Sequence, residues 1–119
     1  MRHLIVRAFP VLSGKEDGLK RFIAGLQQRS EQTSQFYQRY GITRESWHIQ
    51  RTAPGSVLIA VTEFDAPPGD DVVKAYAESQ SPFEAWFKGE VEDFSGINLD
   101  FQPLGPASKC VFDWPPAAP

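Results

Sequence analysis

Three stretches of the chain alternate between apolar and polar positions in the way that β-strands do. They cover residues 2–9, 42–51 and 57–64, and β-branched or aromatic side chains recur in each. Between the last two, Thr52-Ala-Pro-Gly-Ser56 contains the Pro-Gly pair that is typical of a turn. A connection this short predicts an antiparallel hairpin.

Residues 14–40 repeat their apolar side chains at helical spacing. Steps of three, four and seven residues place these side chains on one face, which predicts a single long amphipathic helix. Ser13 and Glu16 have the capping-box spacing of a helix start. Gly41 suits the left-handed conformation that often follows a helix end.

A second helical region is predicted to be broken in two, over residues 70–79 and 82–94. Between the two pieces, Ser81 is a natural N-cap and Pro82 suits the first helical position. Glu84 completes a second capping box. The second helix is therefore expected to break near Ser81-Pro82.

Two segments near the end of the chain are candidates for a last strand. Residues 97–101 and 108–114 are both strand-like, with proline and glycine residues between them. We expect 108–114 to be the last strand, residues 1–114 to form one domain, and residues 115–119 to be a Pro-rich tail.

The order of these elements predicts an α+β protein with a ferredoxin-like βαββαβ fold. Two split βαβ units give a four-stranded antiparallel sheet with the helices on one face. The other face of such a sheet is left without a cover. This open face is where we expect contacts with a partner.

Alternation along the strands divides the side chains of the sheet into two sets. The set richer in strong strand formers is expected beneath the helices: Leu4, Val6, Ala8, Trp47, Ile49, Val57, Ile59 and Val61. The mixed set is expected on the open face: Ile5, Arg7, Phe9, His48, Leu58, Ala60, Thr62 and Phe64. An open face with this much apolar surface usually meets another surface. We therefore expect a homodimer formed through the open sheet face.

Four residues of the mixed set are the candidate ligand-binding residues: Arg7, Phe9, His48 and Thr62. A guanidinium in an apolar cavity can clamp a carboxylate or a phenolate, which is the role considered for Arg7. The alternative is that Arg7 pairs with Glu45 or Glu63, because a buried Arg is rarely left unpaired.

His48 is the candidate catalytic residue, since an imidazole works as an acid or a base near neutral pH. The alternative is that His48 fills the dimer interface. His3 is the only other histidine, so the ligand count predicts no metal site, and no motif predicts a cofactor. The single cysteine, Cys110, is expected to be a small buried side chain and cannot form an internal disulfide.

Charge and hydropathy exclude several classes of partner. Fifteen acidic and 12 basic residues are interleaved, so the chain has no basic stripe for nucleic acid. The chain contains no run of about 18 apolar residues, so no membrane span is predicted. The apolar run at the N-terminus is too short for a signal peptide. We expect a cytoplasmic protein without nucleic-acid or membrane partners.

The element order, the Ser13-Gly-Lys-Glu16 helix start and the Ser81-Pro-Phe-Glu-Ala-Trp-Phe87 segment resemble the dimeric α+β barrel superfamily. The resemblance covers about residues 1–114. It is closer to the uncharacterised-domain families of this superfamily than to its antibiotic-biosynthesis monooxygenases. It implies a homodimer that binds a small hydrophobic or aromatic molecule between two facing sheets.

Three functions stay open at this point. The first is a non-catalytic or uncharacterised homodimer that binds a small molecule, a hypothesis that rests on the mixed face with Arg7 and His48. The second is an enzyme similar to the cofactor-independent monooxygenases of the same superfamily. The third is a non-catalytic structural or interaction module whose sheet face is filled by side chains.

Overall fold

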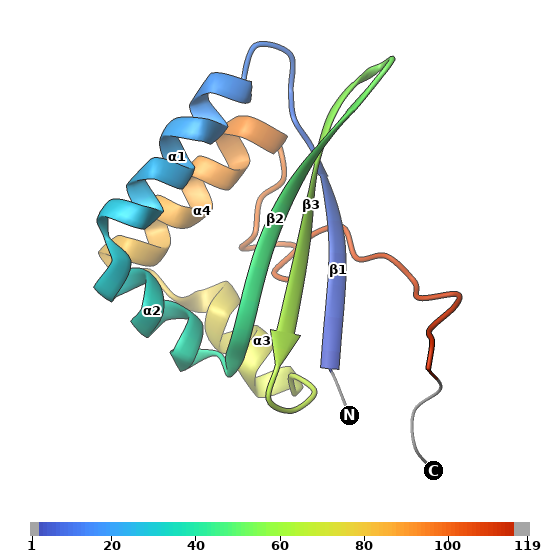
Figure 1. The fold of residues 1–119 in the computed structure, drawn as a ribbon. Helices are drawn as coiled ribbons and strands as arrows, with labels where there is room; N and C mark the ends of the chain where they lie inside the picture. Colours follow the sequence, from blue (N-terminus) through green and yellow to red (C-terminus); the bar gives the residue numbers. More distant parts are fainter. Residues whose placement is uncertain (1–2, 116–119) are drawn as a thin grey trace.

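The computed structural model describes residues 3–115 of the 119-residue chain. In this part of the chain the elements are β1 (His3–Pro10), α1 (Glu16–Gln28), α2 (Ser30–Arg39), β2 (Ile42–Thr52), β3 (Gly55–Phe64), α3 (Asp70–Glu78) and α4 (Pro82–Ser95). The helices gather on one side of an antiparallel sheet, and no described helix covers the other side (Figure 1). The chain is an α+β protein, as predicted.

The sheet has the order β1-β3-β2, with β3 antiparallel to both neighbours. The predicted hairpin is confirmed, with Thr52 paired to Gly55 at its turn. Across the sheet, Arg7 and Trp47 both pair with Ala60, so these three side chains share one face.

The described residues form three strands instead of the predicted four. Residues 108–114 form no strand. At the start of this segment, Ala107 forms an isolated bridge with Arg7, and the N–H and the hydroxyl of Ser108 both donate to the Val6 carbonyl (2.9 and 2.7 Å). Pro106 lies at this bridge and has no N–H to donate to β1, which weakens the pairing. Residues 97–101 contain turns, and of the predicted tail 115–119 only Pro115 lies within the described residues.

The predicted long helix is two helices, because the chain bends at Arg29. The bend allows α1 to pack against α4 while α2 packs against β2. At the bend, the Thr33 hydroxyl donates a hydrogen bond to the Leu26 carbonyl (2.8 Å). Gly41 follows the second helix with φ +71°, as its predicted role requires.

The predicted capping box at the start of α1 is wrong. The N-cap residue is Lys15, and no side chain caps the helix. The Glu16 carboxylate instead accepts hydrogen bonds from Arg51 and Ser56 on the β2–β3 hairpin. Glu16 therefore makes a tertiary contact with the hairpin in place of the local contact that a capping box requires.

The predicted break in the second helical region is confirmed. The Ser81 hydroxyl accepts from the backbone N–H of Glu84 (3.4 Å), and Pro82 is the first residue of α4. Gly96 ends α4 in the left-handed conformation, with φ +77°.

The structure reverses the predicted faces of β1 and β3. The side chains beneath the helices include Arg7, Phe9, Leu58, Ala60, Thr62 and Phe64, together with Trp47 and Ile49 of β2. Leu4, Val6, Ala8, Val57, Ile59 and Val61 share the opposite face with His48. Alternation separates two faces but does not say which one the helices cover when both are apolar. Here the larger side chains lie inside.

Aromatic side chains dominate the core. Phe22 of α1 is 2% exposed, and its ring packs against Trp47 (centroids 5.7 Å apart) and Trp86 (5.2 Å). Gly25 permits this packing, since a Cβ there would lie 2.9 Å from the Trp86 ring. Within residues 3–115, no helix is both long enough and apolar enough to cross a membrane.

Candidate functional site

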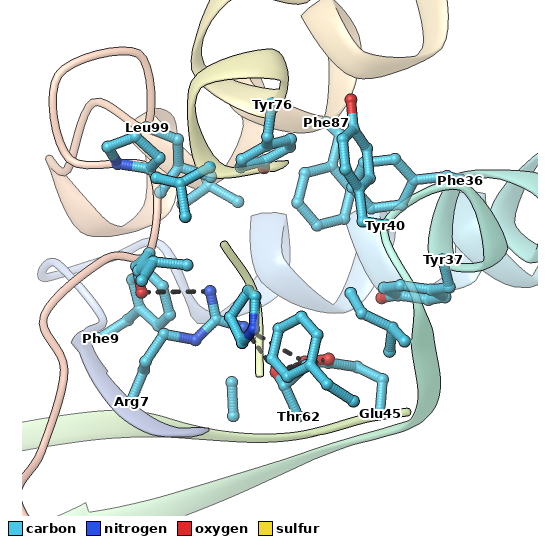
Figure 2. A pocket seen from close by; sticks show the side chains of 18 of the residues that line it. Arg7, Phe9, Phe36, Tyr37, Tyr40, Glu45, Thr62, Tyr76, Phe87 and Leu99 are labelled. Carbon is cyan, nitrogen blue, oxygen red and sulfur yellow. Dashed lines mark hydrogen bonds and ion pairs between the residues drawn. The ribbon is translucent and has the colours of Figure 1, made fainter. Parts of the chain in front are cut away.

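A cavity of about 70 Å³ lies between the helices and the helix-side face of the sheet. Figure 2 shows aromatic rings from α2, α3 and α4 on one side of it and polar strand residues on the other. The aromatic wall consists of Phe36, Tyr37, Tyr40, Tyr76 and Phe87. Such an apolar pocket with a few convergent polar groups is typical of small-molecule sites.

The polar floor of the cavity is a hydrogen-bonded chain across all three strands. Arg7 on β1 donates through Nη2 to the Thr62 hydroxyl on β3 (2.8 Å). Thr62, 1% exposed, donates in turn to Oε2 of Glu45 on β2 (2.7 Å). Trp47 Nε1 donates to the other carboxylate oxygen, Oε1 (2.9 Å). The floor therefore carries one cation and one carboxylate, joined by a hydroxyl.

Arg7 is held in place by the segment that follows α4. Its Nη1 donates to the Leu104 carbonyl (3.2 Å). Gly105, at φ +67°, lets this segment approach the sheet, because a Cβ there would lie 2.6 Å from the Phe9 ring. The Arg7 Nε is buried and has no hydrogen-bond partner among the described residues. A buried donor without a partner is rare in folded proteins.

Burial governs the protonation of the acidic groups around the cavity. It raises the pKa of Glu45, although the Arg7 charge and the hydrogen bonds from Thr62 and Trp47 act in the opposite direction. Burial also raises the pKa of Tyr37 and of Tyr76, so both phenols stay neutral. In Figure 2 the Tyr37 hydroxyl points toward the cavity.

Helix α3 forms one wall of the cavity through Val72, Val73 and Tyr76, which are half-buried, and none of its residues is fully buried. Lys88 of α4 holds the end of this helix. Its ammonium donates to the carbonyls of Tyr76 (2.6 Å) and Ser79 (2.9 Å) and to the Asp100 carboxylate (2.9 Å). A cation at a helix C-terminus is favourable because carbonyls without partners point there.

A second polar cluster fixes Tyr40 in the aromatic wall. The Glu84 carboxylate has no exposed surface and accepts hydrogen bonds from Tyr40, Arg39 and Ser81. Burial alone would raise the pKa of Glu84, but the bonds from Tyr40 and Ser81 and the charge of Arg39 outweigh it and lower the pKa. The cluster ties the end of α2 to the start of α4.

The structure brings together three of the four predicted site residues and separates the fourth. Arg7, Phe9 and Thr62 all line the cavity. His48 shares the opposite face of the sheet with Ile59, and its Nε2 lies 3.1 Å from the Ser46 hydroxyl. The candidate catalytic residue is therefore not part of this site.

The alternative considered for Arg7, a pairing with Glu45, is confirmed (Nη2 to Oε1, 3.5 Å). Glu45 was available to sequence reasoning as a site residue, since it lies two positions before Trp47 and so shares its face. Nothing in the sequence indicated that Tyr37, Tyr40 and Tyr76 line a cavity, because their helical spacing predicts only that they pack against other side chains.

Two further expectations concern metal ligands and the cysteine. In the described part of the chain, no three or more His, Cys, Asp or Glu side chains are grouped so that they could hold a metal ion. Cys110 is exposed, so the expectation of a buried side chain is wrong. It lies in the segment that was expected to be a strand and is not.

The chain matches no protein-family model, and no curated protein or solved structure is significantly similar to it. The resemblance to the dimeric α+β barrel superfamily therefore stays a prediction.

Proposed function

We propose that this protein binds a small, mostly apolar molecule with an aromatic ring in the cavity between its sheet and its helices. One observation carries the proposal: Arg7 lines a cavity walled by aromatic side chains, and its buried Nε has no hydrogen-bond partner among residues 3–115. An oxygen atom of a ligand at this position would satisfy the donor, and the rings would contact the remainder of the ligand. The site differs from the sequence prediction, which placed the ligand between two sheets.

Ring binding requires the cavity to grow. Its volume of about 70 Å³ is roughly half of the 150 Å³ that lets an engineered apolar cavity hold benzene. Helix α3 is the wall that we expect to move, because none of its residues is fully buried and the hydrogen bonds from Lys88 hold it at its C-terminal end. An outward movement of α3 would open the space beside Tyr76.

The proposal is tested by ligand-observed NMR with benzoate, benzamide and phenol as probes. We expect saturation transfer to at least one of them, and we expect Ala60→Leu to abolish it by filling the cavity floor. Ala8→Leu is the matched control, because it adds the same atoms on the opposite face of the sheet. Absence of transfer to all three probes, or equal loss in both variants, would contradict the proposal.

We also propose that the protein is a homodimer formed through the open sheet face. The described residues leave Val6, Ile59 and Val61 of this face without a covering layer. Beside it, the C-terminal segment exposes Val111 (87%), Phe112 (81%) and Trp114 (73%). We propose that residues 108–114 pair with a sheet edge in the dimer, which would supply the fourth strand of a ferredoxin-like fold.

Light scattering coupled to size-exclusion chromatography tests the homodimer. The wild-type chain is expected at twice its mass of 13.3 kDa. Val61→Lys should shift it toward the monomer, because a desolvated charge opposes burial of the face. Lys74→Glu, on the exposed side of α3, is the control. A monomeric wild-type protein would contradict the homodimer proposal.

A further inference from the structure

We infer that the ligand is a small aromatic carboxylate, and that Arg7 turns from Glu45 to the ligand while Glu45 takes up one proton from solvent. This inference rests on the proposed function, because it names the class of ligand and the proton that accompanies binding. The only covalent change is this proton transfer: the bond to hydrogen in a hydronium ion or buffer acid breaks as the O–H bond of Glu45 forms.

Arg7 and Glu45 are ion-paired, but they are not directly hydrogen-bonded. Their nearest charged atoms lie 3.5 Å apart, beyond the roughly 2.7–2.9 Å of a charge-assisted hydrogen bond. Nη2 instead donates to the neutral Thr62 hydroxyl, and Nε donates to no described residue. Nε and Nη2 form one edge of the guanidinium, and such an edge binds a carboxylate through two parallel hydrogen bonds. This edge lacks an anion in direct contact.

Charge balance then requires a proton. A bound carboxylate would place two anions around the single Arg7 cation, within a mostly apolar enclosure. When two carboxylates share one site, their repulsion raises the pKa of one of them, which then takes up a proton. Glu45 is the group that accepts the proton, because burial already raises its pKa in the free protein.

The groups that face Glu45 from each neighbouring element are compatible with its neutral form. Arg7 faces it from β1, Thr62 from β3 and Tyr37 from α2, while Trp47 lies on its own strand. Arg7 is the only cation among them, and it gains the ligand as a partner. The Thr62 hydroxyl can reverse its role and accept a hydrogen bond from the protonated Glu45.

The aromatic wall selects the remainder of the ligand. Phe36, Tyr37 and Tyr76 present rings to the cavity opposite the polar floor. A planar ring that carries its carboxylate at one end would meet both surfaces at once. An aliphatic chain of similar volume would lose the ring–ring contacts.

Isothermal titration calorimetry with benzoate, in two buffers of different ionisation enthalpy, measures the proton directly. We expect an uptake of about one proton per benzoate above the Glu45 pKa, and an affinity that falls about tenfold per pH unit there. Benzamide, which is neutral and of similar shape, should bind without proton uptake and without this pH dependence.

Three variants test whether Glu45 takes up the proton and whether Arg7 binds the carboxylate. Glu45→Gln should bind benzoate with no proton uptake and a flat pH profile, whereas Glu63→Gln, at a carboxylate on the opposite face of the sheet, should behave like wild type. Arg7→Met should weaken benzoate binding far more than benzamide binding, because only benzoate loses a charged partner. Circular dichroism and thermal unfolding establish that each variant is folded.

The outcomes separate this inference from the proposed function. If benzamide binds and benzoate binds no better, or binds without proton uptake, the carboxylate inference is overturned and the cavity still binds a ring. If neither probe binds, the inference and the proposed function fail together.

Discussion

Arg7 and Glu45 face each other across the intervening strand β3, with 3.5 Å between Nη2 and Oε1 and the Thr62 hydroxyl bonded to both. Thr62 accepts from the cation and donates to the carboxylate, so one hydroxyl satisfies both charges. Because the three groups are largely buried, the loss of the hydroxyl would affect both partners.

Thr62→Val should therefore destabilise the fold. Valine keeps the volume of threonine but leaves Arg7 Nη2 and Glu45 Oε2 without this partner. Hydrogen bonds to charged groups contribute about 1.5–3 kcal/mol, and we expect a loss of this size in urea unfolding. Thr43→Val is the matched control on the exposed part of β2, with an expected change below about 0.5 kcal/mol. Equal losses of stability in the two variants would contradict a stabilising role for the Arg7–Thr62–Glu45 hydrogen bonds.

Glu84→Gln should lower stability in a manner that depends on pH. The pKa of Glu84 is lowered from its usual value of 4.5, because the bonds from Tyr40 and Ser81 outweigh its burial. A lowered pKa gives stability that is present above 4.5 and is lost as the pH falls through the folded-state pKa. The deficit of the variant should thus be largest near neutral pH, at roughly 1.5–3 kcal/mol, and should shrink in acid. A deficit that does not change with pH would show that the charge of Glu84 is not involved.

Glu45→Gln should show the opposite slope. Burial raises the pKa of Glu45 above 4.5, so the wild-type protein loses stability as the pH rises from 4.5 through the folded-state pKa. The variant lacks this loss. The stability of wild type relative to Glu45→Gln should therefore fall with rising pH in that window and then level off. Urea unfolding of both proteins across the window measures it, and a relative stability that rises with pH would reverse the assigned sign.

Lys88→Met should free the end of α3. The ammonium is hydrogen-bonded to the Tyr76 and Ser79 carbonyls and to Asp100, and methionine keeps the apolar stem without the donors. We expect a loss of about 1.5–3 kcal/mol in global stability and faster hydrogen exchange of the α3 amides than of the α4 amides.

The control for this substitution is Lys74→Met. Lys74 is 74% exposed and contacts Glu78 at 4.0 Å, a surface pair that contributes at most about 1 kcal/mol. Hydrogen-exchange mass spectrometry separates the two variants. If α3 and α4 exchange equally slowly in both, then α3 is not a movable wall and the cavity cannot open in the proposed way.

Local signals in the sequence were sufficient for the element boundaries that depend on the backbone. Gly41 and Gly96 adopt positive φ at helix ends because glycine, which lacks a Cβ, permits this conformation. Ser81-Pro82 begins a helix because the proline ring fixes φ at a helical value. The hairpin between β2 and β3 could also be predicted from local sequence, since its turn is only a few residues long.

Signals that depended on a distant partner failed. Glu16 pairs with Arg51 and Ser56 on the hairpin instead of capping its own helix. The bend at Arg29 follows from the different packing partners of α1 and α2, which no local pattern contains. The predicted fourth strand has strand-like residues but no covering layer within the described chain, and its side chains are exposed.

By itself the sequence determined that this chain is an α+β protein, where most of its strands and helices lie, and which side chains of each strand share a face. Only the tertiary structure decided which face the helices cover, and so placed Arg7, Phe9 and Thr62 in a cavity with Glu45 and left His48 outside it. The physical reason is that alternation has a period of two and is symmetric between the faces of an apolar sheet. The helices break this symmetry, because the rings of Phe22 and Phe87 pack against Trp47 on the face that carries the larger side chains.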